Sequence, residues 1–193
     1  KLITQLFGDR MYIANATGCS SIWGGSAPST PYTVNKDGKG PAWANSLFED
    51  NAEYGYGMFL AQSTIRNRTI AKVLELSKTT KAAALKKACE EYLETVDDGE
   101  KNSAATDNLI AALKKTKNKA TEEILKDADY LRKKSMWIFG GDGWAYDIGF
   151  SGVDHVIAQG EDVNIFVFDT EVYSNTGGQS SKSTPTGALL SDL

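Results

Sequence analysis

Two continuous apolar runs, separated by an amphipathic stretch, constrain the fold of this chain more than any other feature. The runs are residues 136–139 (Met-Trp-Ile-Phe) and 163–168 (Val-Asn-Ile-Phe-Val-Phe), and residues 145–159 between them have helical periodicity. The side chains expected on the inward face of that helix are Ile148, Val153, Val156 and Ile157. Strands that are apolar on both faces are typical of a parallel sheet covered by helices, and right-handed crossovers join such strands. The sequence therefore predicts a βαβ unit in an α/β fold with a mostly parallel sheet.

The rest of the chain supplies one more strand, a long loop and a helical region. Residues 11–16 are a short apolar segment between turn residues, which is typical of a buried strand. Residues 18–41 are rich in Gly, Ser, Pro and Thr, and we expect a long ordered loop because they include Trp23 and Tyr32. From about residue 45 to about residue 134, apolar residues recur with helical spacing. We expect a single domain, residues 1–193, with a Lys- and Glu-rich helical insertion at about residues 78–134.

Composition and charge exclude several classes of partner. The 193 residues carry a formal net charge of −4, which favours neither a nucleic acid nor an anionic membrane as partner. No apolar run is long enough to cross a bilayer. The chain begins at Lys1, with neither an initiator Met nor a signal peptide, so we expect it to be a piece of a longer protein.

Two cysteines and one histidine limit the chemistry of the chain. Cys19 and Cys89 are too few for a disulfide framework, and a reducing cytosol is the simplest compartment. Taken alone, Cys19 is better explained as a small buried loop residue than as a ligand, and Cys89 lies on the inward face of a predicted helix. The single histidine, His155, disfavours a histidine-rich metal site or a catalytic triad, and we expect it to be structural or solvent-facing.

A glycine-rich turn follows the first of the two apolar strands. Gly140, Gly141, Asp142 and Gly143 stand where the strand becomes a helix. Glycines permit close approach of a ligand to the backbone, and a helix N-terminus offers free N–H groups to a phosphate. A tight turn in which Asp142 only caps the helix explains the turn alone about equally well.

Residues 169–175 (Asp-Thr-Glu-Val-Tyr-Ser-Asn) follow the next strand and add oxygen ligands. Ligands bind at the carboxyl ends of the strands in open α/β sheets, so we expect this loop and the Gly141 turn to lie together there. The Asp142 carboxylate, the Thr170 hydroxyl and the Val172 carbonyl are candidate ligands for magnesium, which takes few ligands from protein and the rest from phosphate and water. The alternative is a plain polar loop after an edge strand, which leaves the pairing of the two features unexplained.

Four motifs resemble pyruvate:ferredoxin oxidoreductase, an enzyme family that uses thiamine diphosphate. They are residues 18–28, 40–57, 140–149 and 169–188, and they occur in the order of that family. The resemblance covers nearly the whole chain except the helical insertion and residues 189–193, which do not match the family's continuation. It implies a three-layer thiamine diphosphate-binding fold.

The resemblance also implies roles for individual residues. The magnesium ligands would be Asp142, Thr170 and the main chain of Val172, and Asn175 would be the catalytic residue near the reacting centre. The cofactor contacts would be Gly141, Asp142, Gly143, Trp144, Thr170, Glu171, Val172, Tyr173, Ser174 and Asn175. Cys19 would be one of the four ligands of the 4Fe–4S cluster nearest the thiamine, and thiolates are the expected ligands of such a cluster. The family's other cluster cysteines and its activating glutamate lie outside these residues, so we expect the isolated chain to be inactive.

The reaction follows from the same resemblance. The parent enzyme would oxidatively decarboxylate pyruvate to acetyl-CoA with coenzyme A and pass electrons through iron–sulfur clusters to ferredoxin or flavodoxin, in anaerobic pyruvate metabolism. We expect a homodimer in the cytoplasm, or in a hydrogenosome-like organelle of an anaerobic eukaryote. Two alternatives stay open: a related thiamine-dependent enzyme for another 2-oxoacid, and a non-catalytic, flavodoxin-like phosphate-binding module.

Other residues have plainer interpretations. We expect interior packing for Trp43, Phe48 and Tyr56, and helix capping or solvation for Glu49, Asp50, Asn51 and Glu53. A basic cluster is interpreted as a solvated helix face, with an acidic electron carrier as the alternative partner; it comprises Lys114, Lys115, Lys117 and Lys119.

Overall fold

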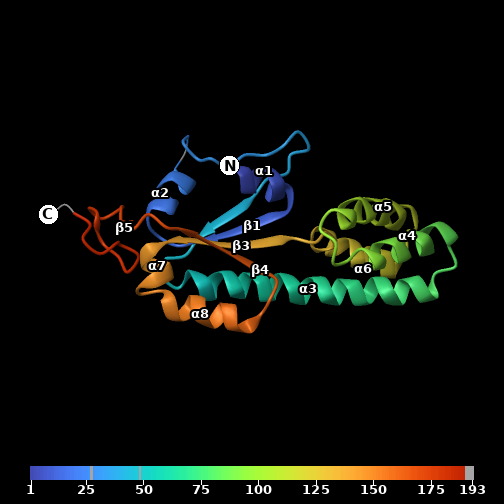
Figure 1. Ribbon diagram of the computed structural model, residues 1–193. Coiled ribbons are helices and arrows are strands. Elements are labelled where there is room, and N and C mark those ends of the chain that lie inside the picture. Colours follow the sequence, from blue (N-terminus) through green and yellow to red (C-terminus); the bar gives the residue numbers. More distant parts are fainter. Residues whose placement is uncertain (27, 48, 190–193) are drawn as a thin grey trace. The chain divides into compact units, whose positions relative to one another are not determined.

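Four parallel strands form the sheet of the first of two compact units. The computed structural model describes residues 1–26, 28–47 and 49–189, and the chain divides into Lys1–Phe59 with Ser135–Leu193, and Leu60–Lys134 (Figure 1). The strands are β1 (Met11–Asn15), β2 (Ala42–Asn45), β3 (Ser135–Gly141) and β4 (Val163–Phe168). They lie in the order β2-β1-β3-β4, and each neighbouring pair is parallel. The predicted α/β fold is confirmed, while Phe48 and residues 190–193 lie outside the described residues.

Helices cover both faces of this sheet, because successive side chains of a strand point to opposite faces. Met11, Ile13 and Phe139 form the apolar cluster of one face, against which α1 (Leu2–Phe7) packs. Ile138 belongs to the cluster of the opposite face, together with Val153 of α8 (Phe150–Gln159) and the first turn of α3 (Asn51–Thr79). Figure 1 shows α1 and α2 on one side of the sheet and α8 on the other. The first unit therefore has three layers.

The crossover between β3 and β4 contains two helices where the periodicity predicted one. The prediction of a continuous helix over residues 145–159 is wrong, because α7 (Asp142–Tyr146) ends before α8 begins. Gly149 lies at the break, where a Cβ would approach the Trp144 carbonyl oxygen to 2.4 Å. The break changes the phase of the helix, so Ile148 is 76% exposed, and Ile157, also expected inside, is 63% exposed. Val153 and Val156 are buried, as predicted.

A short helix lies in the segment predicted to be a loop. This helix, α2 (Cys19–Gly25), begins after Gly18, whose φ of 147° is a backbone conformation that favours glycine. Its last two residues are also glycines, and a Cβ on Gly25 would come within 3.0 Å of the Trp43 ring. The helix is therefore held by packing on Trp43, which a Ser- and Gly-rich sequence does not reveal.

The second unit, Leu60–Lys134, is helical and has its own core. It contains the later turns of α3, with α4 (Ala83–Glu94), α5 (Lys101–Lys115) and α6 (Lys119–Lys126). Cys89 and Tyr92 are fully buried in its core with Leu109 and Ile124, so the prediction of a core role for Cys89 is confirmed. The unit begins at Leu60, within α3, rather than near residue 78. Across the described residues, every helix is too short or too polar to span a membrane.

Candidate functional site

The Gly141 turn and the Thr170 loop meet at the carboxyl edge of the sheet. Gly141, at the end of β3, is the register partner of Phe168, at the end of β4. The next residue, Asp142, is 3% exposed, and its Oδ1 accepts a hydrogen bond from Thr170 N at 3.0 Å. Thr170 Oγ1 donates to the Val172 carbonyl oxygen at 3.0 Å. The three oxygen groups that the sequence singled out thus come together from two segments separated by a crossover.

Glycines at this turn have two different structural roles. A Cβ on Gly140 would lie 2.3 Å from Trp144 Cε3, so the absence of a side chain lets the buried Trp144 ring pack against the strand end. A Cβ on Gly141 would meet only the Phe168 carbonyl oxygen, at 3.9 Å, which is an ordinary contact. Gly140 is therefore required by packing, whereas Gly141 leaves open space beside Asp142.

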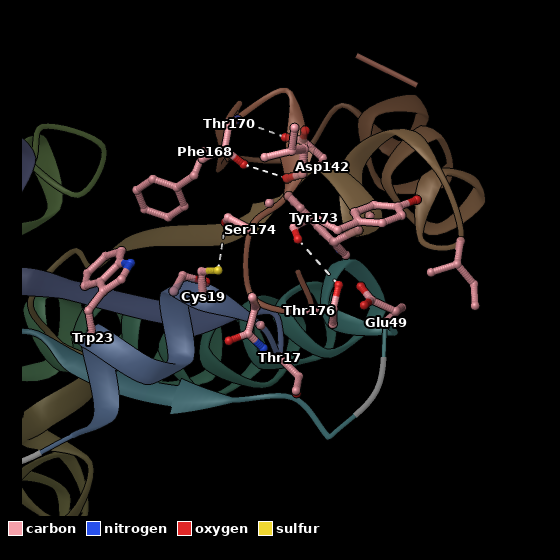
Figure 2. A pocket seen from close by; sticks show the side chains of 18 residues that line it. Thr17, Cys19, Trp23, Glu49, Asp142, Phe168, Thr170, Tyr173, Ser174 and Thr176 are labelled. Atoms are coloured by element: carbon pink, nitrogen blue, oxygen red, sulfur yellow. Dashed lines mark hydrogen bonds between the residues drawn. The ribbon is translucent and has the colours of Figure 1, made fainter. Parts of the chain in front are cut away.

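A cavity of about 620 Å³ opens at this edge of the sheet (Figure 2). Residues 141–144, Thr170, residues 172–175 and Cys19 line it, so most of the predicted contacts share one cavity. Glu171 is not among the lining residues; it is exposed, has a φ of 61° and uses its carbonyl to accept a hydrogen bond from Thr184. The predicted cofactor contact by the Glu171 side chain has no counterpart in the lining of this cavity.

Cys19 lies at the start of α2, on the wall of the cavity. Its Sγ is 2.9 Å from Ser174 Oγ, and Figure 2 shows this contact between the helix and the loop after β4. Within the described parts of the chain, no group of three or more His, Cys, Asp or Glu side chains is placed to hold a metal ion. A single thiolate at Cys19, and a magnesium set with one carboxylate, are both smaller than such a group.

Hydrogen bonds tie the loop after β4 to the residues around α7. Tyr173 OH donates to Asp147 Oδ2, and this bond, together with burial, raises the pKa of Tyr173 to about 12. Tyr146 OH donates to Asp169 Oδ2 at 3.1 Å. Burial first, and then the Asp169 carboxylate, raises the pKa of Tyr146. Both phenols are therefore neutral donors at physiological pH, and both hold the loop in place.

Several cavity residues were not predicted as site residues. Glu49 was expected to cap or solvate a helix, but it lines the cavity, and its buried Oε2 has no hydrogen-bond partner among the described residues. Burial raises the pKa of Glu49. The other lining residues that were missed are Thr17, Ser20, Trp23, Ile148, Phe168 and Thr176. Thr17 and Ser20 follow β1, so the same rule about carboxyl ends of parallel strands identifies them once β1 is placed beside β3.

Asn51 also differs from its prediction. It was expected to cap or solvate the start of α3, but it is fully buried. Its Nδ2 donates to the carbonyl oxygens of Ala14 at 3.1 Å and Phe139 at 2.8 Å. Asn51 therefore fastens the carboxyl ends of β1 and β3 together, beneath the cavity.

The donor set at the Asp142 corner fits a magnesium ion. Magnesium is a hard cation that takes oxygen ligands, often one or two carboxylates with substrate phosphates and water. Asp142 supplies a buried carboxylate, Thr170 a hydroxyl and Val172 a carbonyl, all lining the same cavity. The indole Nε1 of Trp144 is buried without a partner among the described residues and is a further donor in the cavity wall.

Comparison with known proteins extends this description. No protein-family model matches the chain. The chain is 56% identical over 196 residues to pyruvate:ferredoxin oxidoreductase of Moorella thermoacetica and 57% identical over 191 residues to pyruvate-flavodoxin oxidoreductase of Klebsiella pneumoniae. It is 47% identical over 226 residues to pyruvate dehydrogenase [NADP(+)] of Cryptosporidium parvum.

These alignments cover nearly all of this chain but little of each relative. They include 98% of the chain, which spans only 17%, 16% and 12% of the length of the three relatives. By fold and site, the chain is an α/β protein with a ligand cavity at the carboxyl edge of a parallel sheet. By sequence, it belongs, as a segment, to the family of the pyruvate:ferredoxin and pyruvate-flavodoxin oxidoreductases. The resemblance stated from the motifs is confirmed.

Proposed function

We propose that this chain holds the diphosphate end of thiamine diphosphate, through magnesium, in an enzyme that oxidises pyruvate. The observation that carries the proposal is the meeting of Asp142, Thr170 and Val172 at one corner of a cavity, with Thr170 bonded to both of the others. Names of relatives that share 98% of this chain support the choice of pyruvate as substrate. The chain acts as the anchoring domain, and the remainder of the pocket comes from other parts of a full-length protein.

Three oxygen groups would hold the magnesium: the Asp142 carboxylate, the Thr170 hydroxyl and the Val172 carbonyl. Together they leave places for the phosphate oxygens and water that magnesium retains in proteins. The other proposed cofactor contacts are Gly141, Gly143, Trp144, Glu171, Tyr173, Ser174 and Asn175. Glu171 contributes through its main chain, because its side chain is exposed outside the cavity.

The residues of this chain bind and orient the cofactor, and Asn175 is proposed as the catalytic residue. When bound, thiamine diphosphate supplies an electron sink for the decarboxylation of a 2-oxoacid. Asn175 lines the cavity and carries a neutral amide. An amide donates hydrogen bonds to a carbonyl or carboxylate oxygen without adding charge, which suits a group that positions a 2-oxoacid.

Cys19 is proposed as one thiolate ligand of a 4Fe–4S cluster, with the remaining ligands supplied from outside this chain. Support comes from its place on the cavity wall, where its Sγ is 2.9 Å from Ser174 Oγ. A cluster held there would receive electrons directly from the cavity. Such clusters are ligated by cysteine thiolates.

Partners and location are proposed from the names of the relatives. Ferredoxin or flavodoxin would accept the electrons, coenzyme A would accept the acetyl group, and the full-length enzyme would be a cytoplasmic homodimer. A relative from Euglena gracilis, 51% identical over 187 residues, is named as a mitochondrial pyruvate dehydrogenase that uses NADP(+). An organelle and a different acceptor are therefore the alternatives in a eukaryotic source.

Isothermal calorimetry with thiamine diphosphate and magnesium tests the anchoring role. The full-length protein is required, because the chain alone holds part of the pocket. Binding is expected in the wild type and is expected to be lost in Asp142→Ala and strongly weakened in Asp142→Asn. Asp154→Ala, an exposed carboxylate on α8, is the matched control and should bind as the wild type does. Absence of binding in the wild type, or unchanged binding in both Asp142 variants, contradicts the proposal.

A panel of 2-oxoacids and electron acceptors tests the reaction. Pyruvate is expected to give the highest kcat/KM among the 2-oxoacids, and reduction of ferredoxin or flavodoxin is expected to exceed reduction of NADP(+). If another 2-oxoacid is strongly preferred, the cofactor assignment stands and the substrate assignment is wrong.

A further inference from the structure

Residues 181–184, which we name the strap, hold the buried carboxylate of Asp142 from one side. Ser181 Oγ and Ser183 Oγ both donate hydrogen bonds to Asp142 Oδ2, at 2.8 and 2.9 Å. The end of the strap is fastened by Thr184 Oγ1, which donates to the Glu171 carbonyl oxygen. Thr184 Oγ1 also accepts a hydrogen bond from Ser181 N at 2.8 Å, which closes the turn. The strap therefore links the turn after β3 to the loop after β4.

The two oxygens of Asp142 differ in the acceptor positions that remain. A carboxylate oxygen accepts about two hydrogen bonds. Oδ2 accepts two, both from the strap, whereas Oδ1 accepts one, from Thr170 N. Asp142 is 3% exposed, so water does not readily replace a lost partner, and breaking these bonds is costly. The free acceptor position lies on Oδ1, the oxygen beside Thr170.

We infer that Ser181 and Ser183 determine the metal specificity of this site by making Asp142 a ligand through one oxygen only. The inference rests on the proposed function, since it takes the Asp142 corner to be the magnesium site. The two serines act through Asp142 and are positioning residues. They occupy Oδ2 and leave Oδ1 for the cation.

Binding through one oxygen separates magnesium from calcium. Magnesium demands near-ideal octahedral geometry with short bonds, whereas calcium takes about six to eight oxygens and often binds both oxygens of one carboxylate. To bind calcium in that way, Asp142 Oδ2 would lose both serine hydrogen bonds inside a buried site. The strap therefore disfavours calcium and leaves magnesium unaffected.

The test measures the dissociation constants of magnesium and calcium in the full-length protein saturated with thiamine diphosphate. The variants are the Ser181→Ala/Ser183→Ala double variant, the corresponding double threonine variant, and Ser180→Ala as the control. Ser180 is exposed and directly precedes the strap. The double alanine variant is expected to lower the calcium-to-magnesium ratio of dissociation constants about tenfold, the usual lower limit for losing an outer hydrogen-bond partner of a metal ligand. Threonine keeps the hydroxyls and is expected to restore the ratio, and Ser180→Ala should leave it unchanged.

The outcomes separate this inference from the proposed function. If the wild type binds neither cation with thiamine diphosphate, the proposed function fails and this inference fails with it. If the wild type binds magnesium and the folded double alanine variant keeps the wild-type ratio, the inference alone is overturned. If the double variant does not fold, Ser181→Ala and Ser183→Ala are measured singly. A lowered ratio in either one supports the inference, and a wild-type ratio in both overturns it.

Discussion

The phenol of Tyr173 donates a hydrogen bond to Asp147 Oδ2, while the Tyr173 ring lies against Gly143, where a Cβ would come within 3.3 Å of Tyr173 Cε1. One side chain thus fastens the loop after β4 to both ends of the short helix α7. Lys182 of the strap is 3.7 Å from the other oxygen of Asp147. The two halves of the candidate site are therefore joined by side chains as well as through the sheet.

Removing the Tyr173 hydroxyl is expected to weaken cofactor binding without unfolding the protein. In Tyr173→Phe the ring still packs on Gly143, but the loop loses its bond to Asp147. We expect magnesium-dependent binding of thiamine diphosphate by the full-length protein to weaken about tenfold, as is usual when a group that orients a metal ligand is lost. Calorimetry provides the measurement, and Tyr54→Phe, a partly exposed phenol on α3, should show wild-type affinity. Equal affinities in Tyr173→Phe and the wild type would show that this bond does not position the loop.

Adjacent glycines at the end of β3 are expected to respond oppositely to alanine. Gly140→Ala places a methyl group 2.3 Å from the Trp144 ring, so the ring must move, and overpacking of this kind costs about 1–3 kcal/mol of unfolding free energy. Gly141→Ala meets its nearest atom at 3.9 Å and should leave stability nearly unchanged. Because Gly141 lines the cavity, its methyl group is expected to weaken cofactor binding instead. Thermal unfolding and calorimetry of both variants check this division, and a destabilised Gly141→Ala would contradict it.

Much of the fold could be predicted because its strands carry a simple signal. Residues 163–168 are apolar nearly throughout and form β4 over the same residues, since an edge position in a covered parallel sheet still buries both faces in part. The expectation that Asp142 and Thr170 lie together followed from topology alone, and the hydrogen bond between them agrees.

Other features depend on contacts that local sequence does not encode. Helix α2 exists because Trp43 packs against its glycines, and the break at Gly149 exists because the chain passes close to the Trp144 carbonyl. Ser181 and Ser183 reach Asp142 across about forty residues of chain, so neither their spacing nor their chemistry points to that carboxylate. Glu49 had the signature of a helix start, and only the folded sheet places it on a cavity wall.

A neutral side chain at Glu49 is expected to stabilise the protein at neutral pH. Glu49 Oε2 is buried without a partner among the described residues, and burial raises the pKa of the carboxyl above its ordinary value of 4.5. A raised pKa favours the protonated form in the folded state, so this group contributes stability at low pH and loses it as pH rises through the folded pKa. The melting temperature of Glu49→Gln should exceed that of the wild type at pH 7, and the difference should shrink toward pH 4.5. A glutamine variant that melts below the wild type at pH 7 would mean that the charged form has a partner.

Tyr92 gives the second unit a dependence on alkaline pH. Its hydroxyl donates to the Leu131 carbonyl oxygen at 2.8 Å, and the side chain is fully buried. Loss of this bond in Tyr92→Phe leaves a buried carbonyl without its partner, which costs about 1–3 kcal/mol of unfolding free energy at neutral pH. Burial raises the pKa of Tyr92 to about 12, against an opposing effect of Arg66. The unfolded phenol, with its ordinary pKa of 10.0, therefore loses its proton before the folded one does. The stability that Tyr92 contributes is complete below pH 10 and is lost as pH rises toward 12. Urea unfolding followed by circular dichroism should show the advantage of the wild type over Tyr92→Phe as constant from pH 7 to 9 and decreasing above pH 10. Tyr130→Phe, a half-buried phenol of the same unit, is the control, and an advantage of Tyr92 that persists unchanged at pH 11 would contradict the assignment.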